Sequence, residues 1–335
     1  MNEKGNGILC RYSFTVNRTG RAKGAVLLDT DEGYYLMKEY KGTQKHLEFE
    51  YRLLQDISKQ NGILVDNIIE DTEGNIVNKD EDGLRYIVRK WYDAKDMDSK
   101  NLSQVIKAAG VLGKLHGQLE QIKYENTYLS EFFGIDEIQK QLVSESQRHN
   151  SELKRTRNFI RDKRRKNEFE LMVLSSFQDF YREGMEVLEI FDKNNMSEFI
   201  SDNIKAGSII HGQFNYHNII IADERMVITN FEHAKCGMQI RDLYDYTRKT
   251  MEKHGWSSEI GNQLIKEYEE YRKISPMELK YLGLKLKYPE KYWKILNHYN
   301  NNNKAWVPDK DIQKLKLVIE QQDKKQDFVN SLLNL

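Results

Sequence analysis

The sequence predicts an α+β protein of two lobes, in which an antiparallel β-sheet with one main helix precedes a larger helical lobe. Residues 9–40 alternate between apolar and polar side chains, as strands do, whereas most of residues 99–335 place apolar side chains at helical spacing. The chain has 335 residues, enough for two separate cores, and only 3 prolines, which favours helices. We therefore expect a sheet lobe at residues 1–92, a hinge at residues 93–98 and a helical lobe at residues 99–335.

The charge balance argues against two classes of partner. The chain has 52 Lys and Arg residues and 52 Asp and Glu residues, so its formal net charge is zero. Such a chain has no overall field that would draw it to nucleic acid or to a membrane surface.

We also find no apolar run of the roughly 20 residues that a membrane helix needs and no signal-peptide core. Cys10 and Cys236 lie far apart in the sequence, so we expect reduced, inert thiols in an intracellular protein.

The first part of the sheet lobe should be a three-stranded antiparallel unit. Strands are expected at residues 9–16, 24–30 and 34–38. Short polar segments at residues 17–21 and 31–33 separate them as turns. The turn region at residues 20–24 contains two glycines and lies where a phosphate-covering loop would belong, although two glycines alone are a weak signal.

Lys38 ends the third expected strand and precedes a helix predicted from residue 43 to residue 60. Thr43 is a suitable N-cap for this helix. Lys38 is either a solvated strand lysine or the lysine that reaches the α- and β-phosphates of a nucleotide. In the second case Glu48 or Glu50 would be its ion-pair partner, and we favour Glu50.

Further strands are expected at residues 63–69, 76–77 and 86–91, the last of which leads to the hinge. The backbone groups of Lys90, Trp91 and Tyr92 would meet an adenine ring if one binds here.

The helical lobe should begin with a helix capped by Asn101 or Ser103. A basic stretch follows at Lys154–Lys166, where eight basic residues occupy thirteen positions. This stretch is either a solvated helix face or a docking surface for an acidic or polyanionic partner. Additional helices are expected at residues 243–254, 257–273, 276–287 and 309–333.

The most specific pattern lies at residues 209–232. An apolar strand leads into a loop with His211 and Gln213, then come Asn218, two apolar strands with a turn between them, and Asn230-Phe231-Glu232. This order is the layout of the catalytic loop, hairpin and metal loop of kinase-like phosphotransferases. We therefore expect a bilobal protein-kinase-like fold.

Two positions at which phosphoryl transfer uses carboxylates carry amides here. Gln213 stands at the position of the base and can orient a hydroxyl group, but it cannot accept its proton near neutral pH. Asn230 stands at a metal position together with Asn218 and offers only a neutral oxygen, whereas Mg²⁺ prefers anionic ones. Glu232 is the candidate to replace it, because side chains at i and i+2 of an extended segment point the same way. His211 is a second candidate catalytic residue, with a structural role as the alternative.

The whole chain resembles the CotS family of endospore coat proteins, within the superfamily of aminoglycoside phosphotransferases and choline kinases. The matching segments are residues 36–42, 49–54, 82–87, 90–92, 214–218, 229–233 and 288–294. The last of these segments, at residues 214–218, 229–233 and 288–294, separate the chain from antibiotic kinases. The resemblance implies an endospore-forming bacterium, synthesis in the mother-cell cytoplasm and deposition in the spore coat, with other coat proteins as partners.

These observations favour a degenerate phosphotransferase that acts in coat assembly by binding partners. We expect binding of ATP and Mg²⁺ to be weak or absent. Two alternatives remain open. One is an active small-molecule or glycan kinase that uses Gln213, Asn218 and Glu232, and the other is a nucleotide-binding switch without transfer.

Overall fold

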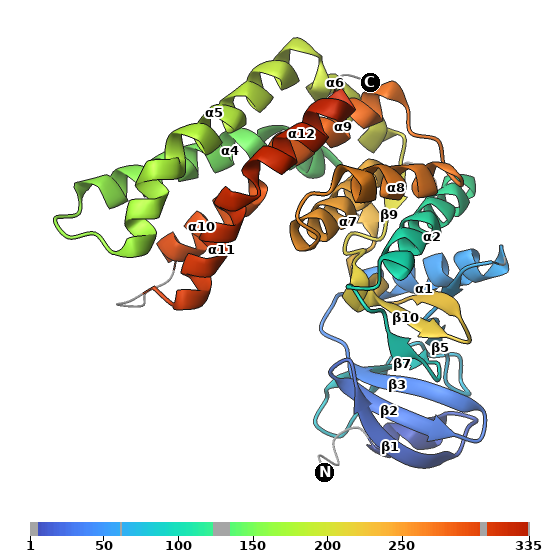
Figure 1. Cartoon of the computed structure of the whole chain (residues 1–335). Coiled ribbons are helices and arrows are strands. Elements are labelled where there is room, and N and C mark those ends of the chain that lie inside the picture. Colours follow the sequence, from blue (N-terminus) through green and yellow to red (C-terminus); the bar gives the residue numbers. More distant parts are fainter. Residues whose placement is uncertain (1–5, 61, 123–134, 302–306, 334–335) are drawn as a thin grey trace. The chain divides into compact units, whose positions relative to one another are not determined.

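The computed structural model describes residues 6–60, 62–122, 135–301 and 307–333. The chain divides into two compact units (Figure 1). Unit 1 comprises residues 1–122 and 211–234, and unit 2 comprises residues 123–210 and 235–335. Each unit therefore contains two separate stretches of the sequence.

Unit 1 contains a six-stranded antiparallel sheet, whose first strands are drawn in blue in Figure 1. Its order is β1 (Val16–Ala22), β2 (Ala25–Thr30), β3 (Gly33–Glu39), β7 (Arg85–Lys90) and β5 (Ile68–Ile69), and β6 (Asn78–Lys79) also pairs with β7. Lys23 and Gly24 form the turn between β1 and β2, with φ angles of 50° and 75°. Positive φ at both residues is what a two-residue type I′ hairpin requires.

The expected first strand at residues 9–16 is wrong, and the expected turn at residues 17–21 lies inside β1. Asn6–Arg11 form a short 3₁₀ helix, η1. The apolar side chains in and next to this alternating segment include Ile8, Tyr12 and Phe14. They pack into a core cluster with Leu28 and Met37. β1 is an edge strand whose five central residues are exposed, so its polar composition resembles that of a turn.

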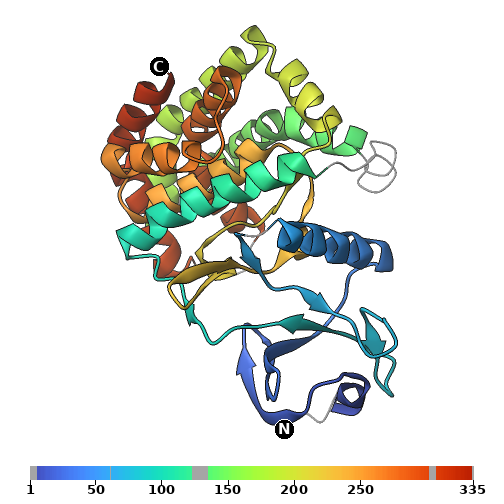
Figure 2. The same ribbon diagram turned by 90° about the vertical axis from the view of Figure 1, so that its right-hand side faces the viewer.

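The helix expected at residues 43–60 is confirmed as α1 (Gln44–Lys59), drawn in blue in Figure 2. The Thr43 hydroxyl accepts a hydrogen bond from the His46 N–H at 3.2 Å, which satisfies one of the free donors at the start of the helix. Leu47, Leu54 and other apolar side chains are buried on one face. Glu50 is buried on the same face, and its position decides the chemistry of the site below.

A second sheet joins distant parts of the sequence. Its order is β4 (Leu64–Val65), β11 (Arg225–Ile228), β10 (Ile219–Ala222) and β8 (Lys95–Asp96). β10 and β11 form the expected hairpin, β4 pairs with β11 in parallel, and β8 pairs with β10 in antiparallel fashion. Through these pairings residues 211–234 pack in unit 1, which also contains α2 (Leu102–Gln121), capped by Asn101. The units thus divide at positions other than the expected lobe boundaries, and part of the expected hinge, Lys95–Asp96, is a strand.

Unit 2 is mainly helical. Its helices are α4 (Ile135–Asp162), α5 (Glu168–Lys193), α6 (Met196–Lys205), α7 (Gln239–Lys253), α8 (Ser258–Glu269), α9 (Pro276–Lys287), α10 (Glu290–Asn301), α11 (Asp309–Glu320) and α12 (Gln322–Leu333). A short antiparallel pair, β9 (Ile209–Ile210) and β12 (Lys235–Cys236), also belongs to it. The expected final helix is divided at Gln321 into α11 and α12. Among the described helices, none is long and apolar enough to span a membrane.

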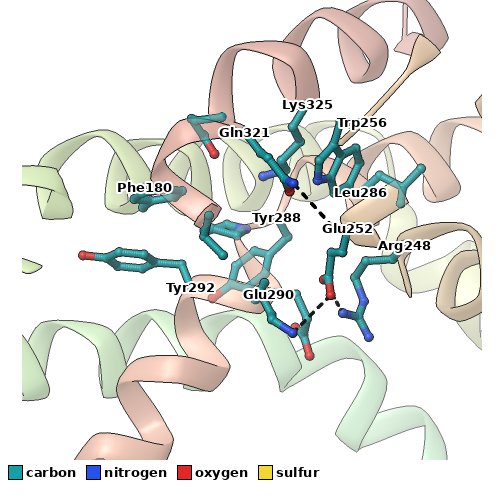
Figure 3. A pocket seen from close by; sticks show the side chains of 14 residues that line it. Phe180, Arg248, Glu252, Trp256, Leu286, Tyr288, Glu290, Tyr292, Gln321 and Lys325 are labelled. Atoms are coloured by element: carbon teal, nitrogen blue, oxygen red, sulfur yellow. Dashed lines mark hydrogen bonds and ion pairs between the residues drawn. The ribbon is translucent and has the colours of Figure 1, made fainter. Parts of the chain in front are cut away.

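Unit 2 contains a narrow, partly open cavity of about 30 Å³ (Figure 3). Trp256, Tyr288 and Tyr292 are among the residues that line it, and Arg248 and Glu252, also in the lining, pair at 2.5 Å. A cavity of this size has room for a water molecule but not for a substrate. The larger candidate site lies in unit 1.

Candidate functional site

A pocket of about 220 Å³ lies within unit 1. Twelve residues line it: Lys23, Ala25, Leu36, Lys38, Asp66, Arg89, Trp91, His217, Asn218, Thr229, Asn230 and Glu232. Ala25, Leu36 and Trp91 provide an apolar wall. Charged and amide side chains line the rest of the pocket, and one of them, Lys38, lies on the same strand as Leu36. The fold thus brings together five residues that the sequence indicated: Lys38, Trp91, Asn218, Asn230 and Glu232.

The ion-pair partner of Lys38 differs from the expected one. The Lys38 ammonium contacts the Glu232 carboxylate at 2.6 Å. Glu50 instead binds Arg89 at 2.7 Å, and both of these side chains are almost fully buried, at 0% and 3% exposure. The expected Lys38–Glu50 pair is therefore wrong, because a second cation on the neighbouring strand β7 takes Glu50.

Arg89 forms the centre of a buried charge cluster. Besides Glu50, its guanidinium group lies 3.7 Å from the Asp66 carboxylate and 3.9 Å from that of Glu232. Three carboxylates thus surround one buried arginine. Such an arrangement compensates the cost of burying each charge only while every member is present.

Asp66 is a buried carboxylate that faces the pocket. Its Oδ2 accepts a hydrogen bond from the Asn230 N–H at 3.0 Å, while its Oδ1 has no partner among the described residues. Burial raises the pKa of Asp66 from 3.8 to about 6, against the lowering effect of the nearby Arg89 charge and the Asn230 N–H. The carboxylate is thus destabilised relative to its protonated form.

We expect Asp66→Asn to change the pH dependence of stability. Because the pKa is higher in the folded state, the folded protein binds the proton more tightly, and the free energy of unfolding falls as pH rises from about 4 through about 6. The variant lacks this loss. Between pH 4 and pH 7 the wild type should lose roughly 2–3 kcal/mol of unfolding free energy that the variant keeps. Urea unfolding of both proteins at a series of pH values measures this difference. Parallel curves for the two proteins would contradict the assignment.

His211 holds the loop in place rather than facing the pocket. Its ring is fully buried, and Nε2 lies 3.1 Å from the Thr229 carbonyl oxygen. Its Nδ1 accepts a hydrogen bond from the Gln213 N–H at 3.2 Å. Gly212 between them has a φ of 78°, and a Cβ atom there would lie 2.2 Å from the His233 carbonyl oxygen. The geometry therefore supports the structural alternative for His211.

The amides of the loop bind one another. The Asn218 Nδ2 donates to the Gln213 carbonyl oxygen at 2.9 Å, and the Asn230 Nδ2 is 3.4 Å from the Asn218 Oδ1. The Gln213 side chain is exposed and is not part of the pocket lining. Asn230 has a φ of 66°, a left-handed conformation that asparagine tolerates better than most residues.

These donors do not fit a magnesium ion well. Mg²⁺ demands near-octahedral oxygen ligands and is usually bound through carboxylates. The Asn218 oxygen is used by Asn230, and the Glu232 carboxylate lies between the Lys38 and Arg89 cations. In the described parts of the chain, no group of three or more His, Cys, Asp or Glu side chains could hold a metal ion.

The residues expected near an adenine ring already use several of their hydrogen-bond donors within the protein. The Lys90 N–H donates to the Asn67 carbonyl oxygen and the Trp91 N–H donates to that of Tyr34, both at 2.8 Å. The Tyr92 hydroxyl donates to the Val65 carbonyl oxygen at 2.9 Å. Among the three expected residues, only Trp91 lines the pocket.

Sequence reasoning missed Asp66, Arg89 and Lys23 as site residues. Lys23, in the β1–β2 turn, donates to the His217 carbonyl oxygen at 2.9 Å. The available signal for Arg89 was a charged residue directly after the apolar run 86–88 of a predicted strand, because a buried charge needs a buried partner. Lys23 lies in the turn at residues 20–24, which was expected at the place of a phosphate-covering loop, but nothing in the sequence singled out this lysine.

Several solved structures that match the chain are phosphotransferases or kinases. An aminoglycoside phosphotransferase from Alicyclobacillus acidocaldarius has a TM-score of 0.84 at 16% identity, over 98% of this chain and 95% of that chain. A spectinomycin phosphotransferase, solved with ADP and spectinomycin, has a TM-score of 0.63 at 13% identity over 98% and 97%. An amicoumacin kinase, solved with AMP-PNP and Ca²⁺, has a TM-score of 0.59 at 13% identity over 96% and 94%. The expected α+β kinase-like fold is confirmed, and at these identities the likeness shows the fold alone.

One family model matches nearly the whole chain. Its description is "Spore coat putative kinase YutH", and it covers residues 6–332. None of the curated proteins gave a match. The family match confirms the resemblance to kinase-like endospore coat proteins that the sequence motifs indicated.

Proposed function

The chain belongs to the YutH family of kinase-like spore coat proteins, and from this membership we propose that it acts in the coat as a degenerate phosphotransferase. Its contribution to coat assembly is to bind other coat proteins. The protein would be synthesised in the mother-cell cytoplasm and then deposited in the coat.

The observation that carries the proposal is the hydrogen bond between the Asn230 and Asn218 amides. In an active kinase-like site, carboxylates hold the metal ions that neutralise the phosphates. Here the two amides hydrogen-bond each other, and the carboxylate of the same motif, Glu232, pairs with Lys38. With Gln213 at the base position, the loop offers no carboxylate there that could accept a proton. The two carboxylates that line the pocket, Asp66 and Glu232, both lie near the buried Arg89 cation, at 3.7 Å and 3.9 Å.

The pocket retains some features that suit a nucleotide without its metal. Trp91 and Leu36 offer apolar surface to a base, and the Lys23 and Lys38 ammonium groups lie in the lining. Both lysines are already paired, Lys23 with Asp96 at 2.5 Å and Lys38 with Glu232. An incoming phosphate would have to replace these internal ion pairs. We therefore propose that ATP with Mg²⁺ binds weakly or not at all.

We expect millimolar Mg²⁺ and ATP to raise the melting temperature very little. A ligand present at 100 times its dissociation constant would add about 2.7 kcal/mol, which corresponds to several degrees in a protein of this size. Differential scanning fluorimetry with and without Mg²⁺ measures the shift.

The Lys38→Ala variant is the control for specificity. A shift of several degrees in the wild type that disappears in Lys38→Ala would contradict weak binding. It would favour a second candidate, a nucleotide-binding switch without transfer, which the two pocket lysines and Trp91 support. Formation of ADP in the same samples would separate an active kinase from such a switch.

A further inference from the structure

One end of the α4–α5 pair in unit 2 carries concentrated positive charge. The basic stretch that was expected to be helical is helical only to Asp162, where α4 ends, and its last residues connect α4 to α5. Five of its basic side chains are exposed: Lys154, Arg155, Arg161, Arg164 and Arg165.

The chain itself neutralises little of this charge. Arg161 pairs with Asp162 at 2.8 Å, and Lys163 pairs with Glu170 at 2.5 Å. Among the described residues, no ion pair involves Lys154, Arg155, Arg164 or Arg165. The guanidinium groups of the last three are therefore available to anions from outside the chain.

Exposed apolar side chains accompany these cations. Phe159 is 54% exposed, and Leu171, in the first turns of α5, is 56% exposed. Arg155 lies four residues before Phe159 on α4, so the two side chains share one helix face. The Lys163 ammonium lies 5.2 Å from the centre of the Phe159 ring. Aromatic and arginine side chains together are enriched at the energetically important positions of protein interfaces.

The backbone that presents these side chains is well held. Lys163 also hydrogen-bonds the Tyr299 hydroxyl at 3.1 Å, and the Tyr299 ring stacks on Phe169 at 5.0 Å. Asn167 and Glu170 form a capping box at the start of α5. A surface that is ordered before association loses less conformational freedom on binding.

We propose that Arg155, Phe159, Arg164, Arg165 and Leu171 form a docking surface for an acidic peptide segment of a partner protein. This surface is named the basic-aromatic surface below. The proposal rests on the partner-binding function proposed above and gives that partner a chemistry. Unpaired guanidinium groups call for carboxylates, and the exposed Phe159 and Leu171 call for apolar side chains between them. A peptide supplies both, whereas a polyphosphate supplies no apolar cover.

Fluorescence anisotropy with two labelled peptides tests the proposal on the full-length protein. One peptide alternates glutamate with leucine, and the other is polyglutamate of the same length. We expect the mixed peptide to bind more tightly, and binding to weaken with salt because charge attraction drives encounter. Exchanging Arg155, Arg164 and Arg165 for serine should weaken the binding of both peptides about tenfold, because three exposed charge pairs, each of small energy, are lost. Phe159→Ser should weaken the binding of the mixed peptide and leave the binding of polyglutamate unchanged.

The matched control exchanges three exposed arginines of unit 1, Arg18, Arg21 and Arg52, for serine. This control should bind both peptides as the wild type does, and all variants should keep the wild-type melting temperature. Equal weakening in the control, or unchanged binding in the Arg155, Arg164 and Arg165 variant, would overturn the proposal. Tighter binding of oligothymidylate than of either peptide would also overturn it. Peptide binding is measured without nucleotide, so its failure is distinguishable from a failure of the degenerate-site proposal, which the Mg²⁺ and ATP experiment tests.

Discussion

Replacing Arg89 by leucine should lower the free energy of unfolding by about 3–5 kcal/mol, the usual cost of removing one partner from a buried ion pair. The loss arises because Glu50 and Asp66 would remain as buried carboxylates without their cation. Glu50 has no exposed surface and already has one oxygen, Oε2, without a partner among the described residues. Urea unfolding followed by tryptophan fluorescence measures the change.

The companion variant in this experiment is the triple variant Arg89→Leu with Glu50→Leu and Asp66→Asn. It removes the stranded charges and should recover much of the lost stability, because a buried ion cluster and an apolar replacement are often nearly equivalent. Arg52→Leu, on an exposed position of α1, should change stability by no more than about 0.5 kcal/mol. A loss below about 1 kcal/mol for Arg89→Leu would show that Arg89 is not the centre of the cluster.

The double variant Gln213→Asp with Asn230→Asp should create or raise ATP hydrolysis. Asp at position 213 supplies a proton acceptor, and general base catalysis contributes roughly 10²–10⁴ in rate. Asp at position 230 cannot donate to the Asn218 oxygen, so it breaks the bond between the amides and adds an anionic metal ligand. Steady-state ADP release with Mg²⁺ measures the gain.

Asn215→Asp is the control, because it changes an amide to a carboxylate in the same loop at neither position. Asn215 caps the short helix η2 (Tyr216–Asn218), and aspartate can keep this cap, although it loses the 2.7 Å hydrogen bond from the Asn215 Nδ2 to the Gln213 carbonyl oxygen. This control should show no gain. Wild-type turnover already at roughly 1–100 per second, the range of active kinases, would show that the two amides are no defect.

The elements that sequence reasoning placed correctly have strong local signals. α1 combines a capping threonine with a regular apolar face, and the β10–β11 hairpin combines two apolar runs with a two-residue turn at Asp223 and Glu224. The error at residues 9–21 has a tertiary cause. Side chains of η1 and the following segment pack against strands far along the chain, and an edge strand needs no apolar pattern of its own.

The sequence predicted which residues belong to the candidate site better than it predicted the contacts between them. The motif order indicated Lys38, Asn218, Asn230 and Glu232, and all four line one pocket. The pairing of Lys38 could not be predicted, because it depends on competition between two cations for the carboxylates. Arg89 takes Glu50, which leaves Glu232 to Lys38, and no spacing in the sequence encodes that exchange.

The pairing of Leu64 and Val65 with Val227 and Ile228 has a consequence for synthesis of the chain. The ribosome produces the strands of the six-stranded sheet within the first 90 residues, so that sheet can form early. The second sheet has to wait for the hairpin. At about 5–20 residues per second, translation of residues 123–210 delays the hairpin by on the order of ten seconds. During that interval β4 and β8 lack the strands with which they pair in the folded protein, and such unpaired strand edges are prone to aggregation.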